Sequence, residues 1–226
     1  MCKRVQFQAD INEVAKRFSV SMVESNPLIQ PQTELIGFDH PFHPVIKADT
    51  PDTLSTNFQW GLIPPDWNKL PNGIWNHTVN AKLEYLSRRY SWSKVTQNRC
   101  LVPVTAYYEF HWNDPKGKSK TKFVVKNFES EIFALAGLHS AWTDKTGKVY
   151  HTFTICTTRG NETMEFVHNK DAAKDYHRMP VMFNKEDERY WLDTSLDYMD
   201  FAYPNYKPKL VAAPVEGEPA VQLGLF

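Results

Sequence analysis

Short runs rich in β-branched and aromatic residues, each bounded by proline, aspartate or asparagine, recur along most of this chain. Such runs are typical of β-strands, because branched and aromatic side chains pack well on a pleated surface and the bounding residues favour turns. The pattern predicts strands at residues 33–38, 45–48, 57–63, 99–112, 122–128, 132–142, 150–158, 178–183 and 210–215.

Helical spacing is confined to a few places. Asp10 has the character of an N-cap, since apolar residues follow it at positions 11, 14, 15 and 18. The pattern also predicts short helices at 81–89, 161–169 and 185–193, and a long Pro- and Asn-rich loop at 64–78. Strands and helices do not alternate strictly, so a parallel sheet is not favoured. We therefore expect an α+β fold with a curled, mainly antiparallel sheet, or partly open barrel, and flanking helices.

Length and charge set limits on domains and partners. A chain of 226 residues suits one domain, which we place at 1–217, followed by a flexible tail at 218–226. Basic and acidic residues both number 26, so a nucleic-acid partner would need a local basic groove. The N-terminus is polar and no run approaches the ~20 apolar residues of a membrane span. We expect a cytosolic monomer without a membrane partner.

Three cysteines, at positions 2, 100 and 156, lack the CxxC spacing of a zinc site or a disulfide framework. Cys2 is the notable one, because Met1 is expected to be removed before so small a residue. An N-terminal cysteine carries an amine with a pKa of about 7.7–8.0 and a thiol with a pKa of about 8.5 on adjacent carbons. With an aldehyde, the amine can form an imine and the thiol can then close a thiazolidine ring. Position alone does not distinguish this chemistry from a chance cysteine near a terminus.

Five segments support the aldehyde chemistry of Cys2: MCKR at 1–4, WGLIPPDW at 60–67, VNAKLE at 79–84, YYEF at 107–110 and HRMPVMF at 177–183. In order and spacing they resemble the motifs MCGR, WGxxPxW, NARxE, [YF]xE[FW] and a histidine before RMP of the SRAP (SOS-response-associated peptidase) family. The resemblance spans nearly the whole chain. It implies an SRAP-like fold and covalent capture of abasic sites in single-stranded DNA through Cys2, with no cofactor and no metal.

The resemblance also implies roles for two polar residues. Asn80, at the start of the predicted helix 81–89, would both cap that helix and hydrogen-bond a substrate or the Cys2 amine. Glu109 lies in an aromatic strand, where a carboxyl group tends to have a raised pKa that suits proton transfer. From the residues alone, Asn80 could equally be a simple N-cap and Glu109 an outward-facing strand residue.

Two histidines compete for the remaining role, which is to protonate the sugar ring oxygen and open the abasic sugar. His177 directly precedes Arg178-Met179-Pro180, whereas the family histidine lies two residues before RMP, at a helix end. Counting from the end of the strand at 150–158 places His168 at that helix end, with 169–177 as an insertion. We favour His168 and keep His177 as the alternative.

DNA contacts follow from the same resemblance. Arg4, Lys82, Thr157 and Arg178 occupy positions at which the family contacts DNA, and Lys82 replaces the usual arginine, which loses the bidentate fork. Trp67 is a candidate platform for base stacking, although it comes one residue later than the family spacing. Trp60 is expected in the core. Lys3 replaces the family's glycine, which reduces backbone freedom beside Cys2.

The tail carries a separate signal. Gln222, Leu223, Leu225 and Phe226 resemble the QLxLF peptide with which bacterial proteins dock on the DNA-polymerase sliding clamp. Docking would place the protein at replication forks in the nucleoid. A terminal strand packed on its own domain is the alternative.

The leading hypothesis is therefore a covalent abasic-site sensor, with AP-lyase activity if the imine eliminates before the thiol closes. One alternative is a cysteine peptidase that uses Cys2, Glu109 and a histidine, acting on peptide bonds in general or only on the bond that exposes Cys2. The other is a noncatalytic adaptor that binds single-stranded DNA or the clamp.

Overall fold

A computed structural model describes residues 2–170 and 177–217 of the chain. The strands are β1 (Arg4–Phe7), β2 (Ser21–Met22), β3 (Gln32–Ile36), β4 (Phe42–Lys47), β5 (Thr50–Trp60), β6 (Asn80–Lys82), β7 (Arg99–Val104), β8 (Ala106–Trp112), β9 (Lys120–Asn127), β10 (Phe133–Thr143), β11 (Val149–Arg159), β12 (Arg178–Pro180) and β13 (Leu210–Pro214). The α-helices are α1 (Ile11–Phe18), α2 (Tyr90–Ser93), α3 (Glu162–Val167) and α4 (Glu188–Leu192). Short 3-10 turns are η1 (Gly37–Asp39), η2 (Pro71–Gly73), η3 (Trp75–His77), η4 (Leu83–Tyr85) and η5 (Tyr198–Phe201).

Five strands close into a barrel. The order β11-β10-β7-β4-β5 is antiparallel throughout, and β11 returns to β5 through a parallel pairing that sets His151 against Phe58. The short strands β12, β6 and β2 extend this sheet at its edges. The expected α+β fold with a mainly antiparallel, barrel-like sheet and flanking helices is confirmed.

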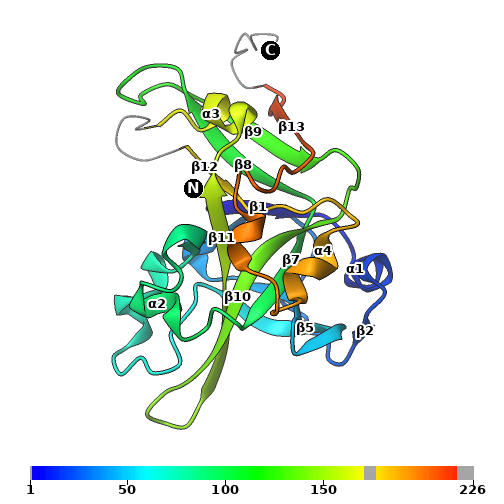
Figure 1. Cartoon of the computed structure of the whole chain (residues 1–226), viewed down its shortest axis with the longest axis vertical. Helices are drawn as coiled ribbons and strands as arrows, with labels where there is room; N and C mark the ends of the chain where they lie inside the picture. Colours follow the sequence, from blue (N-terminus) through cyan, green and yellow to red (C-terminus); the bar gives the residue numbers. More distant parts are fainter. Residues whose placement is uncertain (1, 171–176, 218–226) are drawn as a thin grey trace.

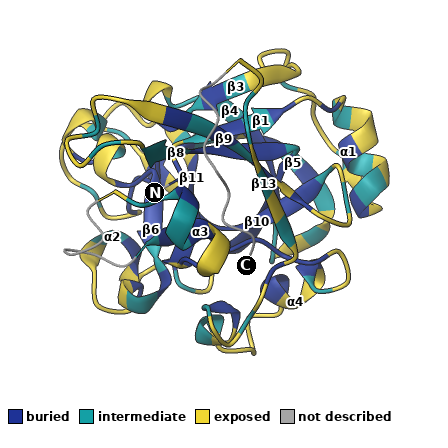
Figure 2. Cartoon of the chain, turned by 90° about the horizontal axis from the view of Figure 1, so that it is seen from above, coloured by how far each residue is buried: buried dark blue, intermediate teal, exposed yellow. Residues whose placement is uncertain are grey.

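A second sheet has the order β13-β9-β8-β1-β3. In Figure 1, its strands β8, β9 and β13 lie above the barrel strands β5, β7 and β10. Strand β1 pairs with β8 so that Val5 is opposite Tyr107, and it pairs with β3 on its other side. In Figure 2, the start of the chain lies near β6, β11 and α3.

The core is one large apolar cluster shared by both sheets, with solvent-facing residues on α1 and α4 (Figure 2). Trp60 is buried in it, and its indole N–H donates to the Val79 carbonyl at 2.7 Å. The prediction that Trp60 belongs to the core is confirmed. A buried indole without such an acceptor would lose the hydrogen bond it makes with water.

Local capping explains where two helices begin. The Asp10 carboxylate accepts from the Asn12 amide, and the Glu13 side chain returns to the Asp10 amide, which completes a capping box. Helix α3 begins after Asn161, whose side chain accepts from the Met164 amide at 3.0 Å. Both N-termini agree with the pattern of the sequence.

The predicted helix at 81–89 is wrong, and with it the role of Asn80 as an N-cap. Residues Asn80–Lys82 form β6, which pairs in parallel with β11 so that Asn80 is opposite Ile155, and the single turn η4 follows. Backbone partners offered by β11 override a weak local helix propensity here. Strands β1 and β2 and helix α2 were not expected from the pattern either.

Among the described residues, no helix has both the length and the apolar character that crossing a membrane would require.

Candidate active site

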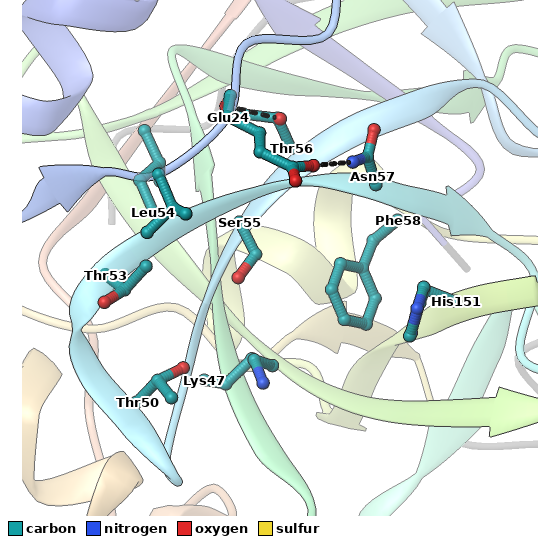
Figure 3. A pocket seen from close by; sticks show the side chains of 11 residues that line it. Glu24, Lys47, Thr50, Thr53, Leu54, Ser55, Thr56, Asn57, Phe58 and His151 are labelled. Carbon is teal, nitrogen blue, oxygen red and sulfur yellow. Dashed lines mark hydrogen bonds between the residues drawn. The ribbon is translucent and has the colours of Figure 1, made fainter.

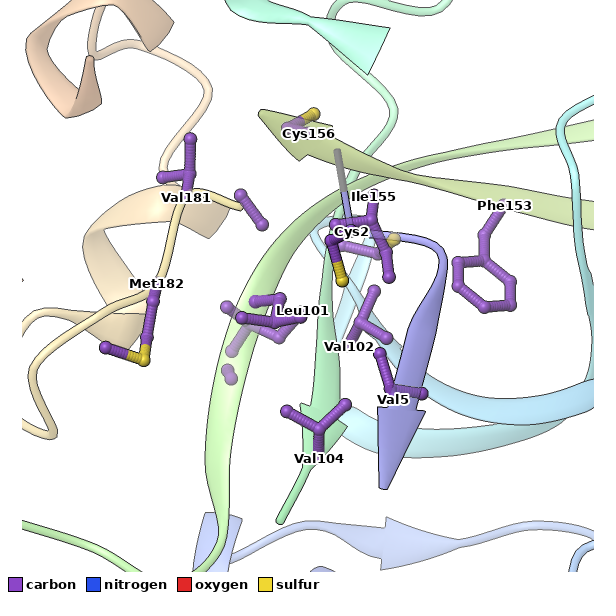
Figure 4. Close-up of a cluster of buried hydrophobic side chains, with 14 of the residues drawn as sticks. Cys2, Val5, Leu101, Val102, Val104, Phe153, Ile155, Cys156, Val181 and Met182 are labelled. Carbon is purple, nitrogen blue, oxygen red and sulfur yellow. The ribbon is translucent and has the colours of Figure 1, made fainter. Parts of the chain in front are cut away.

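Cys2 immediately precedes β1 and is completely buried in the main core. Figure 4 shows it in the cluster that includes Val5, Val102 and Ile155. Its thiol donates to the Arg4 carbonyl at a long 3.8 Å. Burial raises the pKa of the Cys2 thiol, and the nearby Glu109 carboxylate raises it further. The sulfur is therefore held as a neutral thiol, which is a weak nucleophile.

Glu109 lies on β8, the strand beside β1. Its side chain is only 5% exposed, and burial raises the pKa of its carboxyl group, an effect that Lys3 and the Phe110 amide partly offset. The charge of Glu109 contributes to the raised pKa of the Cys2 thiol, so the two groups lie within electrostatic range of each other. A carboxyl group with a raised pKa holds its proton more readily than a free one, which suits proton transfer. The expected environment of Glu109 is confirmed.

Asn80 presents an amide that the described residues leave without a hydrogen bond. Both its Oδ1 and its Nδ2 are buried, and neither has a partner. Asn80 is opposite Ile155 of β11, and Ile155 belongs to the same buried cluster as Cys2. Most buried amides are hydrogen-bonded, so an unsatisfied one is suited to receiving a ligand.

His168 is the residue at which α3 ends. Its Nδ1 lies 3.2 Å from both the amide nitrogen and the carbonyl oxygen of Arg178. Burial lowers the pKa of His168 to about 3, so the ring is neutral near pH 7. It can therefore donate a hydrogen bond from a neutral ring, but it does not carry the positive charge of an imidazolium.

His177, the alternative, lies beside His168 at the start of β12. Its Nδ1 is 2.7 Å from the His168 carbonyl, so the imidazole is engaged in holding the end of α3. Residues 171–176 of the insertion between the two histidines lie outside the described residues.

Tyr107 was not identified from the sequence. It lies two residues before Glu109 on β8, and its buried hydroxyl contacts the Met164 sulfur at 3.5 Å. Burial raises the pKa of Tyr107, and the charges of Cys2 and Glu109 add to the shift. The period-2 spacing to Glu109 within YYEF was the available signal. Through Tyr107, β8 connects Cys2 to helix α3.

Two of the predicted DNA contacts are buried. The Arg178 guanidinium makes two 2.9 Å hydrogen bonds to Glu84, and its Nη2 donates to the Thr157 carbonyl at 2.7 Å and to Thr157 Oγ1 at 3.2 Å. Both Arg178 and Thr157 are thus engaged within the protein. Glu84 had no assigned role, although it is the acid of the VNAKLE segment.

Two others are more accessible. Arg4 is about one-third exposed and pairs with Glu34 at 2.8 Å. Lys82 is half-buried, with its ammonium 5.9 Å from the centre of the Tyr85 ring. Neither contact prevents these side chains from turning toward a phosphate, because surface ion pairs contribute little free energy.

Trp67 belongs to a separate small cluster with Ile63, Ile74 and Trp142. Its carbonyl accepts from the Trp142 indole at 2.6 Å, and its half-buried ring lines a groove of about 490 Å³ together with the exposed Leu70. The ring therefore has one accessible side.

Another cavity, of about 290 Å³, lies along β4 and β5 (Figure 3). Lys47, Ser55 and His151 are among its lining residues, and none of the predicted site residues is. No group of three or more potential metal ligands occurs in the described ranges. The clamp-like residues Gln222, Leu223, Leu225 and Phe226 lie outside those ranges.

Strand β11 is the element that these residues share. Asn80 is opposite Ile155 of β11, which lies in the same buried cluster as Cys2. His168 contacts the main chain of Arg178, whose strand β12 pairs with β11 at Arg159. Glu109 raises the pKa of the Cys2 thiol.

Comparisons with known proteins find relatives that match nearly the whole chain. The family model described as SOS response associated peptidase (SRAP) matches residues 1–218. Abasic site processing protein YoqW of Bacillus subtilis is 32% identical over 203 residues, which cover 88% of this chain and 84% of that protein. Abasic site processing protein YoaM of the same species is 28% identical, over 88% and 83%. A crystal structure of a protein from Bacteroides thetaiotaomicron has a TM-score of 0.83 and 25% identity, over 96% and 93%.

The unpartnered amide of Asn80 leads to a stability prediction. Asn127 is a matched control, because it is also a buried strand asparagine but makes bonds to the Phe183 carbonyl and to the Glu129 and Ser130 amides. Asn80→Ala should stay within about 1 kcal/mol of wild type in unfolding free energy, whereas Asn127→Ala should lose about 3 kcal/mol. Urea denaturation measures both, and equal losses would contradict the unsatisfied state of Asn80.

Proposed function

The chain belongs to the SOS response associated peptidase (SRAP) family, and from this premise we propose that it recognises abasic sites in DNA and captures them covalently through Cys2. One observation carries the proposal: Cys2 and Glu109 are both buried, the charge of Glu109 acts on the Cys2 thiol, and the buried amide of Asn80 has unmet hydrogen bonds. Relatives named abasic site processing proteins support the substrate. The lesion would lie in single-stranded DNA.

The first step is opening of the abasic sugar. The closed deoxyribose is a hemiacetal, and its aldehyde appears only when the bond between the ring oxygen and C1′ breaks. A neutral imidazole at His168 can donate a hydrogen bond to that ring oxygen, which stabilises the developing alkoxide until a proton is transferred. The proton of the C1′ hydroxyl leaves to Glu109 or to water.

The second step joins protein to DNA. After Met1 is lost, the Cys2 amine attacks the aldehyde carbon, and Glu109 takes the ammonium proton and returns it to the carbinolamine hydroxyl, which leaves as water. Asn80 orients the amine. The thiol then adds across the imine: sulfur bonds to C1′, the thiol proton goes to nitrogen, and a thiazolidine ring results.

The electrostatics of Cys2 favour this order over peptidase chemistry. A cysteine peptidase needs a thiolate, whereas burial and Glu109 keep the Cys2 thiol protonated. An imine is electrophilic enough to accept a thiol as its proton departs. If the imine instead loses the 3′ phosphate by β-elimination, the same site acts as an AP lyase.

DNA binding would use the accessible groups around this corner. Arg4 and Lys82 would contact phosphates, and the half-buried ring of Trp67 would stack on a neighbouring base. Arg178 and Thr157 would support the site from beneath, since the terminal nitrogens of Arg178 already bond to Glu84 and Thr157.

The crosslink itself is testable with a single-stranded oligonucleotide that carries one abasic site. Wild type should give a band that survives denaturing electrophoresis, and Cys2→Ala should give none without reductant, because alanine supplies the amine but no thiol. Borohydride should trap the Cys2→Ala imine. Cys100→Ala, which removes another buried thiol, should crosslink as wild type does. Peptide cleavage without any crosslink would support the peptidase instead.

The choice of histidine can be tested in the same assay. His168→Ala should slow crosslinking about 100-fold or more, as expected when a positioned acid is removed, while His177→Ala should stay close to wild type. Single-turnover rates on identical oligonucleotides provide the comparison. The reverse ranking would assign the role to His177.

We also propose that the tail, through Gln222, Leu223, Leu225 and Phe226, docks on the DNA-polymerase sliding clamp. Deletion of 222–226 should abolish retention on immobilised clamp and leave the crosslinking rate unchanged. A scrambled tail of the same composition is the control. Retention of the deleted protein would refute the docking proposal without affecting the crosslink.

A further inference from the structure

Exposed lysines lie on the hairpin that joins β8 to β9 and just after α3, which is beside this hairpin in Figure 1. We call the following four residues the basic arm: Lys116, Lys118, Lys120 and Lys170. Their ammonium groups pair with no carboxylate among the residues that the structure describes, whereas Lys122, further along β9, pairs with Glu34 at 3.0 Å. Four cations are therefore available here, in a chain whose positive and negative charges balance as a whole.

The indole of Trp112 holds two of these cations in place. The ammonium groups of Lys120 and Lys170 each lie 5.1 Å from the centre of its ring. An aromatic ring attracts a cation without neutralising it, as a carboxylate would. Gly117 has a φ of +61°, and a Cβ at this position would lie 2.6 Å from the indole, so the turn packs directly on the ring. Trp112 therefore gives the basic arm a defined shape and leaves its positive charge intact.

The acid of this turn is occupied by the main chain. The Asp114 carboxylate accepts from the Lys116 amide at 2.9 Å and from the Ser119 amide at 2.7 Å. It thus orders the turn through backbone donors and forms no ion pair with the lysine side chains around it. A local positive potential remains at the hairpin, as a polyanionic partner requires.

The base of the hairpin is attached beside His168. The neighbouring residue, Asn169, accepts from the Trp112 amide at 2.7 Å and donates to the Trp112 carbonyl at 3.0 Å. Burial lowers the pKa of His168, and the positive charge of Lys170 adds to the shift. The basic arm therefore begins within electrostatic range of a residue of the proposed site.

We propose that the basic arm binds phosphates of the DNA strand on one side of the abasic site. This inference rests on the proposed function, because it takes the strand that carries the lesion as the ligand. Several ammonium groups on an ordered hairpin suit the repeating charge of a phosphate chain, and they read no base edge, so the contact is independent of sequence. A strand whose lesion lies at His168 has to continue past one side of that histidine, and Asn169 joins the arm to the site there.

The first test measures binding of an undamaged, fluorescently labelled single strand by anisotropy. A variant that combines Lys116→Gln, Lys118→Gln and Lys120→Gln should bind about 10-fold more weakly at low salt and should lose most of the salt dependence that wild type shows. Because the replaced side chains are exposed, the variant should fold as wild type does. Wild-type affinity and salt dependence in this variant would overturn the inference.

A matched control removes the same charge from exposed lysines elsewhere on the molecule. It combines three substitutions: Lys16→Gln, Lys126→Gln and Lys207→Gln. This control should stay within about 2-fold of wild type, since its lysines lie away from the hairpin. Equal weakening in the two variants would show that only net charge matters, and would also overturn the inference.

The second test asks where the arm contacts the strand. A tetrahydrofuran analogue of the abasic sugar has no aldehyde, so binding can be measured without reaction on oligonucleotides that extend from it only in the 5′ or only in the 3′ direction. The hairpin variant should weaken binding of one of these oligonucleotides and leave the other unchanged. Equal loss on both would contradict the assignment. Absence of a crosslink between wild type and a true abasic site would refute the proposed function, whereas binding of the undamaged strand would still decide the role of the arm.

Discussion

Desolvation of Cys2 and Glu109 is the constraint on which the rest of the site depends. Both groups are removed from water at the contact between β1 and β8, and each would be costly to charge there. A negative charge on Glu109 makes a second one on Cys2 still more costly, so the thiol stays protonated. Such an arrangement suits a reaction in which the amine acts first and the thiol follows.

Strand β11 connects the elements that carry the other candidate site residues. It pairs with β10 and with β5 to close the barrel, and its last part pairs with β6 and β12. Asn80 and Arg178 are thus fixed to one rigid strand, although they are far apart in the sequence. Rigid strands position groups more precisely than loops do, which matters when a misplacement of about 1 Å costs reactivity.

Much of this could be predicted from the sequence, and the failures have physical causes. Strand segments such as β10 and β11, the cap at Asp10 and the burial of Trp60 follow from local patterns. The helix at 81–89 did not form, because β11 offers backbone partners that no local pattern reveals. The ion pair between Glu84 and Arg178 was also not predicted, because the two residues are far apart in the sequence and no local pattern brings them together.

The charge of the chain bears on how it would bind DNA, because 26 basic and 26 acidic residues give it no net positive charge to attract a polyanion. Two of its family-type basic positions have acidic neighbours, with Arg4 on Glu34 and Arg178 on Glu84. With these cations paired inside the protein, fewer phosphates would be neutralised on binding, so noncovalent affinity for DNA should be low and should depend only weakly on salt. The proposed covalent capture would remove the need for tight prior binding, since a bond that forms during a brief encounter retains the lesion whatever the initial affinity. Weak noncovalent binding would also help selectivity, because undamaged strands carry no aldehyde and would be released quickly.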